Sequence, residues 1–274
     1  MSITTRLAAI APLNRFVSRA IERLPYSLRT MLLSAIREGI VRRPPFQGVY
    51  ARFEDAAASY PSAASAEAFA KAGLSLKREE AAGLVILRRS HALLAVAVGM
   101  LAKRTQPLRI LDFGGSGGID YQLVKETTGA ALRYQIVEVP ATCEAGRKLW
   151  PDDPQITFAE TLPSEGEFDI VYAWSAIHYV PDPLDLLVRF TRYRPQIILI
   201  VHSPFAPRAF VRAQVQGTVC LPHWVISLPE AERVMQENGY RLAMRATDDF
   251  AYNVDNYDPE HQVPHMANLL FVRD

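Results

Sequence analysis

From Arg109 onward, the sequence alternates short apolar runs with helical patterns. The apolar runs are rich in Ile, Val and Leu without alternating polar residues, which is typical of strands covered by helices on both faces. Five such strands are expected, over residues 108–114, 132–139, 155–160, 168–176 and 195–203. This alternation of strand and helix patterns predicts an α/β fold with a doubly wound, Rossmann-like sheet.

Local signals mark the helices between these strands. Gly129 should stop the first helix, and Pro140 suits the first turn of the second because it lacks an amide hydrogen that would go unpaired there. Ser227 and Glu230 form a capping box for a later helix that Gly239 ends. The expected helices cover residues 119–129, 140–150, 184–193 and 228–238.

The chain ends with two strand patterns, over residues 240–248 and 268–274, with no helix-length pattern between them. Two strands without a crossover helix favour an antiparallel finish. A plain dinucleotide-binding domain would continue with parallel strands. We therefore expect a sheet of about seven strands with an antiparallel C-terminal strand.

A glycine-rich loop joins the first expected strand to its helix. The stretch ILDFGGSGGIDY, residues 110–121, places four glycines within five residues, directly behind an apolar run that ends in a carboxylate. Ligands of doubly wound folds bind at this position, where glycines let backbone amides approach closely. The spacing does not fit the G-x-G-x-x-G of NAD or FAD, and no G-K-[ST] follows for an ATP phosphate. A carboxylate beside the loop would repel a pyrophosphate but favour a ligand that carries an ammonium and a sulfonium.

These residues resemble the first motif, D-x-G-x-G-x-G, of the class I S-adenosylmethionine-dependent methyltransferases. Asp112, Gly114 and Gly118 match the motif, and Ser116 stands in place of its middle glycine. Glu138, at the end of QIVEV, matches the acid that in this class accepts hydrogen bonds from the two ribose hydroxyls. The resemblance implies S-adenosylmethionine as the cofactor. It assigns cofactor contacts to Asp112, Gly114, Gly115, Gly118, Glu138 and Ser175.

The likeness runs from about Phe46 to the C-terminus. The segments FQGVY, LDFGGSGGIDY, VEVP and SAIHYVPDP are similar to a family of methyltransferases often associated with polysaccharide or secondary-metabolite genes. Residues 168–183 look like the fourth-strand motif and its loop, which flank the cofactor and the acceptor in that class. The resemblance therefore implies methyl transfer to a small molecule or a glycan.

Histidines near the carboxyl ends of the expected strands are candidate general bases for a hydroxyl acceptor. His178 and Tyr179, after the fourth strand, are the predicted catalytic residues, and His178 would either act as the base or orient the acceptor. His202 and His223 are further candidates, with His223 expected in a loop before the capped helix. His91, within an apolar helix, is expected to be a hydrogen-bonded core residue.

Two other functions stay open at this point. An aminopropyltransferase would use the same scaffold, but no acid-rich loop follows the fourth strand to bind a polyamine. A non-catalytic partner protein with this fold is the second alternative. The absence of [DN]-P-P-[YFW] after the fourth strand weighs against methylation of amino groups on adenine or glutamine.

The composition indicates which binding partners and which cellular compartment suit the protein. The 274 residues carry a formal net charge of +1, which weighs against a nucleic-acid partner. The two cysteines are far apart and show no metal-ligand spacing, so neither a disulfide framework nor a metal site is expected. No apolar segment reaches the roughly 18 residues that a membrane span requires. We expect a cytoplasmic protein.

The N-terminal region differs from the rest of the chain in its charge and in its helical pattern. Residues 1–43 carry eight arginines against two glutamates, a balance of +6, on an amphipathic helical pattern. This helical arm could contact an anionic membrane surface or a protein partner, pack on its own domain, or support a homodimer. An aromatic-rich turn is expected at residues 46–50, followed by short helices and a longer apolar helix over residues 84–104. We expect a helical arm and cap over residues 1–85 and a cofactor-binding methyltransferase domain over residues 86–274.

Overall fold

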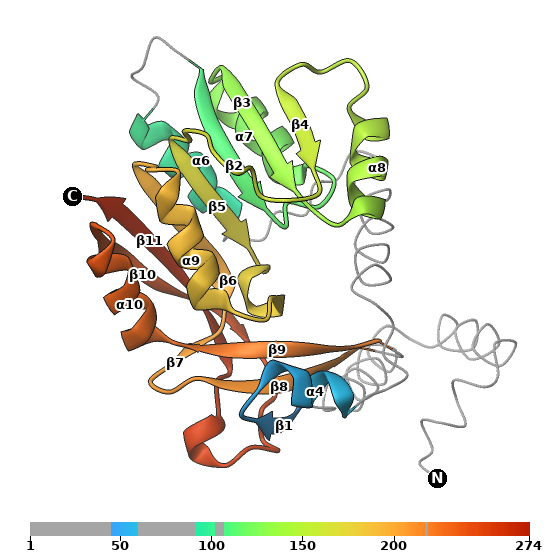
Figure 1. Ribbon diagram of the computed structural model, residues 1–274, viewed down its shortest axis with the longest axis vertical. Helices are drawn as coiled ribbons and strands as arrows, with labels where there is room; N and C mark the ends of the chain where they lie inside the picture. Colours follow the sequence, from blue (N-terminus) through green and yellow to red (C-terminus); the bar gives the residue numbers. More distant parts are fainter. Residues whose placement is uncertain (1–44, 60–90, 102–106, 217–218) are drawn as a thin grey trace, which may run out of the picture. The chain divides into compact units, whose positions relative to one another are not determined.

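The computed structural model describes residues 45–59, 91–101, 107–216 and 219–274 (Figure 1). The chain divides into two compact units, residues 1–44 and residues 45–274. The basic helical arm therefore lies outside the described residues, as do residues 60–90. The predicted domain boundary at residue 85 stays a prediction.

Seven strands form the main sheet, in the order β10-β11-β6-β5-β2-β3-β4 (Figure 1). Their bounds are β2 Leu108–Phe113, β3 Leu132–Val137, β4 Ile156–Ala159, β5 Ile170–Trp174, β6 Ile197–Ser203, β10 Tyr240–Ala251 and β11 His265–Arg273. The strands β2 to β6 pair in parallel, whereas β11 is antiparallel to both β6 and β10. The predicted doubly wound sheet and its antiparallel finish are confirmed.

The direction in which the chain adds strands reverses at β2. From this strand the chain builds β3 and β4 on one side and then crosses to build β5 and β6 on the other. In the sheet, Asp112 of β2 lies between Ile136 of β3 and Tyr172 of β5. Ligands of open α/β sheets bind outside the carboxyl ends of the strands at such a reversal. The glycine-rich loop leaves β2 at this point.

Gly129, Pro140 and Ser227 mark helix ends as predicted. The helices are α4 Phe53–Ala58, α6 Ala92–Leu101, α7 Ile119–Thr128, α8 Pro140–Leu149, α9 Pro183–Arg192 and α10 Leu228–Glu237, with short 3₁₀ helices η2 Ile177–Tyr179 and η3 Pro259–His261. Gly129 ends α7 with φ of +60°, and the Ser227 hydroxyl accepts the Glu230 amide hydrogen over 3.4 Å. Within the described ranges, no helix has both the length and the apolar character needed to cross a bilayer.

Both faces of the main sheet are buried, as the unbroken apolar runs predict. In β6, Ile198 and Ile200 belong to a core that includes α9 and α10. The intervening Leu199 and Val201 belong to a second core that includes α6 and α7. Burial of alternate residues on opposite faces explains why this strand contains no polar residue before His202.

A second sheet, which the sequence pattern did not predict, has the strand order β1-β8-β9-β7. Its strands are β1 Phe46–Tyr50, β7 Phe205–Ala206, β8 Phe210–Gln216 and β9 Val219–Ser227. β1 pairs with β8 and β8 with β9, both antiparallel. Three of these strands lie between β6 and α10, so this sheet is an insertion in the main fold that an N-terminal strand completes (Figure 1).

Two expectations about this region were wrong. The segment at residues 46–50 is a strand rather than a turn, and His223 lies in β9 rather than in a loop. Pro222 masked the strand pattern, because proline is disfavoured inside a sheet. Here it is tolerated because β7 pairs only with Ile226 and Ser227, so no described strand adjoins β9 on that side of Pro222.

Candidate active site

The glycine loop, residues 114–118, turns from β2 into α7 through left-handed backbone conformations. The φ angles are +75° at Gly114, +53° at Ser116 and +86° at Gly118. Glycine enters this region without steric cost, whereas serine does so with some strain. Ser116 nevertheless adopts the left-handed conformation, so its departure from the motif does not prevent the turn.

Two glycines of the loop are required by close packing. A Cβ atom on Gly114 would lie 2.4 Å from Cβ of Ala176, and one on Gly115 would lie 2.2 Å from Oδ2 of Asp112. Ala176 belongs to the loop after β5, so that loop emerges beside the glycine loop, as predicted. Asp112 lies directly beneath the glycine loop.

Asp112 supplies a buried carboxylate at this position. Its side chain is fully buried and accepts a hydrogen bond of 2.7 Å from the Tyr134 hydroxyl. Burial, together with the charge of Asp112, raises the pKa of Tyr134, which keeps the hydroxyl protonated as a donor. A negative charge at this position would disfavour a pyrophosphate above the loop and favour a cation.

Glu138 directly follows β3, and its side chain contacts the glycine loop. Its Oε1 accepts the Ser116 amide hydrogen over 3.1 Å, and its Oε2 accepts the Val139 amide hydrogen over 2.9 Å. Glu138 therefore lies next to the glycine loop. Its contact with a ribose stays a prediction.

The loop after β5 carries the other predicted site residues. Ser175 has a left-handed φ of +51°, and its amide donates to the Val201 carbonyl over 2.9 Å. Ala176 then contacts Gly114, and η2 follows with His178 and Tyr179. Ser175 is thus held one residue away from the glycine loop.

His178 lies in a buried cluster of polar aromatic side chains. Its side chain is 1% exposed, and its Nδ1 lies 3.3 Å from the Ser203 hydroxyl. Its ring centroid is 4.3 Å from that of Tyr179 and 4.4 Å from that of His223. Burial and the nearby positive charge of Arg212 lower the pKa of His178 and of His223. The structure thus brings three of the candidate residues together.

His202, at the carboxyl end of β6, is held by a separate set of partners. Its Nδ1 contacts the Asp248 carboxylate, and its Nε2 lies 3.1 Å from the Tyr252 hydroxyl. The ring stacks on Trp174 with centroids 5.1 Å apart. His91 stacks on Trp174 at 4.5 Å and pairs with Asp120, so the prediction that His91 is hydrogen-bonded is confirmed.

Four residues that the sequence did not single out complete these two clusters. Asp248 and Tyr252 contact His202, while Arg212 and Gln214 contact His223 and Tyr179. Asp248 ends the predicted strand 240–248 and could have been paired with His202 had the strand order been known. No feature of the sequence around Arg212 indicated that its side chain would lie near the candidate site residues. Among the described residues, no group of His, Cys, Asp and Glu side chains could hold a metal ion.

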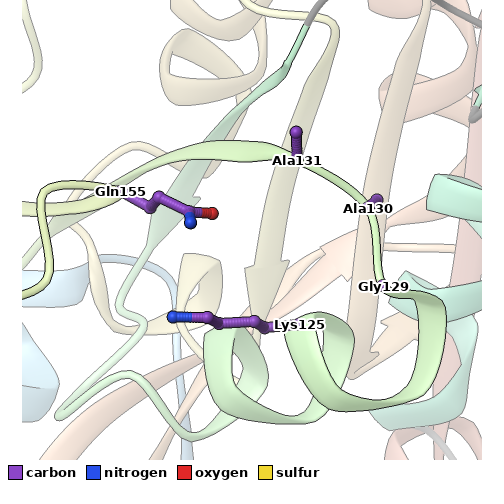
Figure 2. Close-up of a pocket in the computed structure, with 5 residues that line it drawn as sticks. All are labelled: Lys125, Gly129, Ala130, Ala131 and Gln155. Carbon is purple, nitrogen blue, oxygen red and sulfur yellow. The ribbon is translucent and has the colours of Figure 1, made fainter.

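A hollow elsewhere on the surface is unrelated to these residues. Figure 2 shows it between Lys125, Gln155 and the backbone of residues 129–131. The last of these residues and Gln155 lead into the amino ends of β3 and β4. The glycine loop lies at the carboxyl ends of the parallel strands, so this hollow is at the opposite edge of the sheet.

These features fit S-adenosylmethionine. The glycines let the backbone approach a ligand closely, Glu138 adjoins the loop, and the charge of Asp112 suits the cationic cofactor rather than a pyrophosphate. Together with a seven-stranded sheet that ends antiparallel, they define a class I S-adenosylmethionine-dependent methyltransferase, and the protein is an enzyme of that class. A family model described as a methyltransferase domain matches residues 86–244, more than half of the chain, so the chain belongs to this methyltransferase family.

Solved structures share this fold at low sequence identity. The 1,6-didemethyltoxoflavin-N1-methyltransferase of Burkholderia thailandensis, which has S-adenosylhomocysteine bound, is 16% identical with a TM-score of 0.51. The match covers 84% of this chain and 93% of that one. An amino pentose methyltransferase from Micromonospora echinaspora is 14% identical with a TM-score of 0.44, over 68% of this chain and 92% of that one. No curated protein sequence matches the chain.

Replacing Glu138 with alanine should weaken S-adenosylmethionine binding by about 1–3 kcal/mol, the usual effect of losing hydrogen bonds to a charged acceptor. Calorimetric titration would measure the change. Glu144→Ala is the matched control, because Glu144 is exposed on α8 and pairs only with Lys148 among the described residues. Unchanged affinity in Glu138→Ala would exclude Glu138 from the cofactor site.

The buried histidines should make stability depend on pH. The pKa values of His178 and His223 are lowered in the folded protein, so below pH about 6.5 the unfolded chain binds protons that the folded chain does not. Each histidine then lowers the free energy of unfolding by up to roughly 1.4 kcal/mol per pH unit, until the pH reaches its folded pKa. Urea unfolding at pH 7.5, 6.5 and 5.5 should show a shallower decline for His223→Gln than for the wild type. Parallel declines would contradict this assignment.

Proposed function

We propose that this enzyme transfers a methyl group to a hydroxyl of a small molecule or glycan. The observation that carries the proposal is the pairing of His202 with Asp248 at the carboxyl end of β6. When bound, S-adenosylmethionine supplies a methyl group already activated by its positive sulfur. A hydroxyl acceptor must in addition lose its proton, and a histidine paired with a carboxylate is suited to take it.

In this proposal His202 is the base. Asp248 contacts Nδ1 and would stabilise the positive charge that the ring gains, so Nε2 is the nitrogen that accepts the proton. The Tyr252 hydroxyl, 3.1 Å from Nε2, marks the side from which an acceptor hydroxyl would approach. Trp174 fixes the ring by stacking, and the residues after Trp174 lead to the glycine loop.

His178 and Tyr179 then orient the acceptor. No described carboxylate pairs with His178, and the positive charge of Arg212 opposes its protonation. A histidine that stays neutral can still donate or accept a hydrogen bond. The structural neighbour with 1,6-didemethyltoxoflavin bound is in keeping with a small-molecule acceptor, although that enzyme is an N1-methyltransferase.

Methyl transfer itself can be tested with S-adenosylmethionine labelled in its methyl group. The enzyme would be incubated with the filtered small-molecule fraction of a lysate, with heat-inactivated enzyme as control. We expect the label in a small molecule, stable to mild alkali and released by hydroiodic acid, as a methyl ether requires. Release by mild alkali would indicate a methyl ester, and the absence of labelled small molecules above the heat-inactivated control would contradict the proposal.

His178→Ala tests the division of roles. We expect unchanged affinity for S-adenosylmethionine, a raised acceptor KM and a loss of turnover below the ~10² that removal of a general base causes. A larger loss of turnover at unchanged KM would make His178 the base. Loss of cofactor binding would place His178 in the cofactor site.

A further inference from the structure

Arg212 is a buried cation without a carboxylate partner in the described part of the chain. It lies within β8, and its side chain is 0% exposed. Nε lies 3.4 Å from Nδ1 of His223, and Nη1 lies 3.5 Å from the Val263 carbonyl oxygen. Both distances are at the upper limit for a hydrogen bond. Nη2 has no hydrogen-bond partner among the residues that the structure describes.

The groups around this guanidinium do not neutralise it. Its carbon lies 3.4 Å from the centroid of the Phe46 ring, which offers a cation–π contact but no negative charge. Burial raises the pKa of Tyr179, so that phenol is neutral at pH 7, and His223 is neutral because its pKa is lowered. Burial lowers the pKa of Arg212 to about 10, which still leaves it charged.

An isolated buried charge is costly unless an opposite charge or a full set of hydrogen bonds accompanies it. A guanidinium has five N–H donors, and here two of them make long contacts. The fold therefore retains a strong, poorly satisfied donor in its interior. Such a group is suited to an anion that arrives from outside the chain.

The position of Arg212 connects it with the proposed acceptor residues. Arg212 contacts His223, and the His223 ring contacts His178 at 4.4 Å between centroids. We infer that Arg212 binds a carboxylate group of the methyl acceptor, so that the substrate is an anionic small molecule with an aromatic or otherwise flat body that fits among these rings. This inference rests on the proposed function and adds the charge of its substrate.

Benzoate and benzamide form a suitable pair of probes, since they share a shape and differ in charge. Thermal unfolding would be followed at increasing concentrations of each, with S-adenosylhomocysteine present throughout. A ligand that binds the folded state raises the unfolding midpoint. We expect benzoate to raise the midpoint of the wild-type protein and benzamide to leave it unchanged. No effect of benzoate, or equal effects of both probes, would overturn the inference.

Variants assign the effect to one side chain. Arg212→Met should weaken benzoate binding about 30-fold or more, as expected for removing one member of a buried charge pair. Arg212→Lys keeps the charge without the planar fork and should bind benzoate with intermediate strength, which provides a test if Arg212→Met does not fold. Arg208→Met, at an exposed arginine nearby, should behave as the wild type.

Two further outcomes would overturn the inference. Unchanged benzoate binding in Arg212→Met would mean that the anion binds elsewhere. Loss of the stabilisation by S-adenosylhomocysteine in that variant would place Arg212 at the carboxylate of the cofactor. Benzoate binding requires no turnover, so failure here is distinguishable from failure of the proposed function, which would appear as absence of labelled methyl ether.

Discussion

His202→Asn is expected to lower turnover by ~10² to 10⁴, the usual contribution of a general base, without changing the affinity for S-adenosylmethionine. Asparagine is the appropriate replacement because His202 has a left-handed φ of +52°, which asparagine tolerates better than most residues. The loss follows from removing the one described histidine that contacts both a carboxylate and a hydroxyl. Steady-state kinetics and calorimetry would separate the two effects.

Two further variants, one at Asp248 and one at an exposed histidine, test whether the loss is specific to the His202 pair. Asp248→Asn should also reduce turnover, since an amide stabilises a charged imidazole less well than a carboxylate does. His265→Asn, at an exposed histidine on β11 whose Nδ1 lies 3.2 Å from the backbone carbonyl oxygen of Asp248, tests whether a backbone contact at Asp248 is enough, and it should stay within about twofold of the wild type. Full activity of His202→Asn would return the role of base to His178, or show that the acceptor needs none. A parallel loss of cofactor binding would assign His202 to the cofactor site.

Gly114→Ala should be the most damaging substitution in the glycine loop. The new Cβ would lie 2.4 Å from Cβ of Ala176, on a backbone with φ of +75°. Overpacking costs about 1–3 kcal/mol and a left-handed alanine about 1–2 kcal/mol, so the free energy of unfolding should fall by roughly 2–5 kcal/mol. Urea unfolding would measure this loss, and S-adenosylmethionine affinity should fall with it because the loop must shift.

A second substitution separates the cost of overpacking from the cost of the left-handed backbone. Ala176→Gly removes the atom that the new Cβ meets, so the double variant should recover the overpacking part and keep only the left-handed cost of about 1–2 kcal/mol. Gly129→Ala is the matched control, since Gly129 has φ of +60° but no atom within 4 Å of an added Cβ. It should lose only the left-handed part. A double variant as unstable as Gly114→Ala would contradict the packing explanation.

The main sheet and the cofactor loop were predictable because their signals are local. Unbroken apolar runs, Gly129, Pro140 and the Ser227 cap each act within a few residues of the structure they specify. The proximity of Glu138 to the glycine loop follows from adjacent parallel strands, whose carboxyl ends meet at one edge. These inferences do not require knowing which strands far apart in the sequence pair with each other.

The acceptor side was not predictable in the same way. β1 finds its partner β8 more than 150 residues later, and a five-residue segment gives no indication of so distant a pairing. His202 and Asp248 meet because β10 and β6 flank β11 and run in the same direction, so their carboxyl ends lie at one edge. The buried Arg212 became visible only when β8 was placed against His223 and Phe46.

The pairing of β1 with β8 also bears on how the chain is made. During translation, β1 leaves the ribosome long before β8 has been synthesised, and Phe46, fully buried in the finished protein, has no strand partner during that interval. Pairing over so long a separation is entropically slow to form. The sheet that carries Arg212 can therefore close only after the strands β2 to β6 of the main sheet have emerged, and until then Phe46 must wait without its native neighbours.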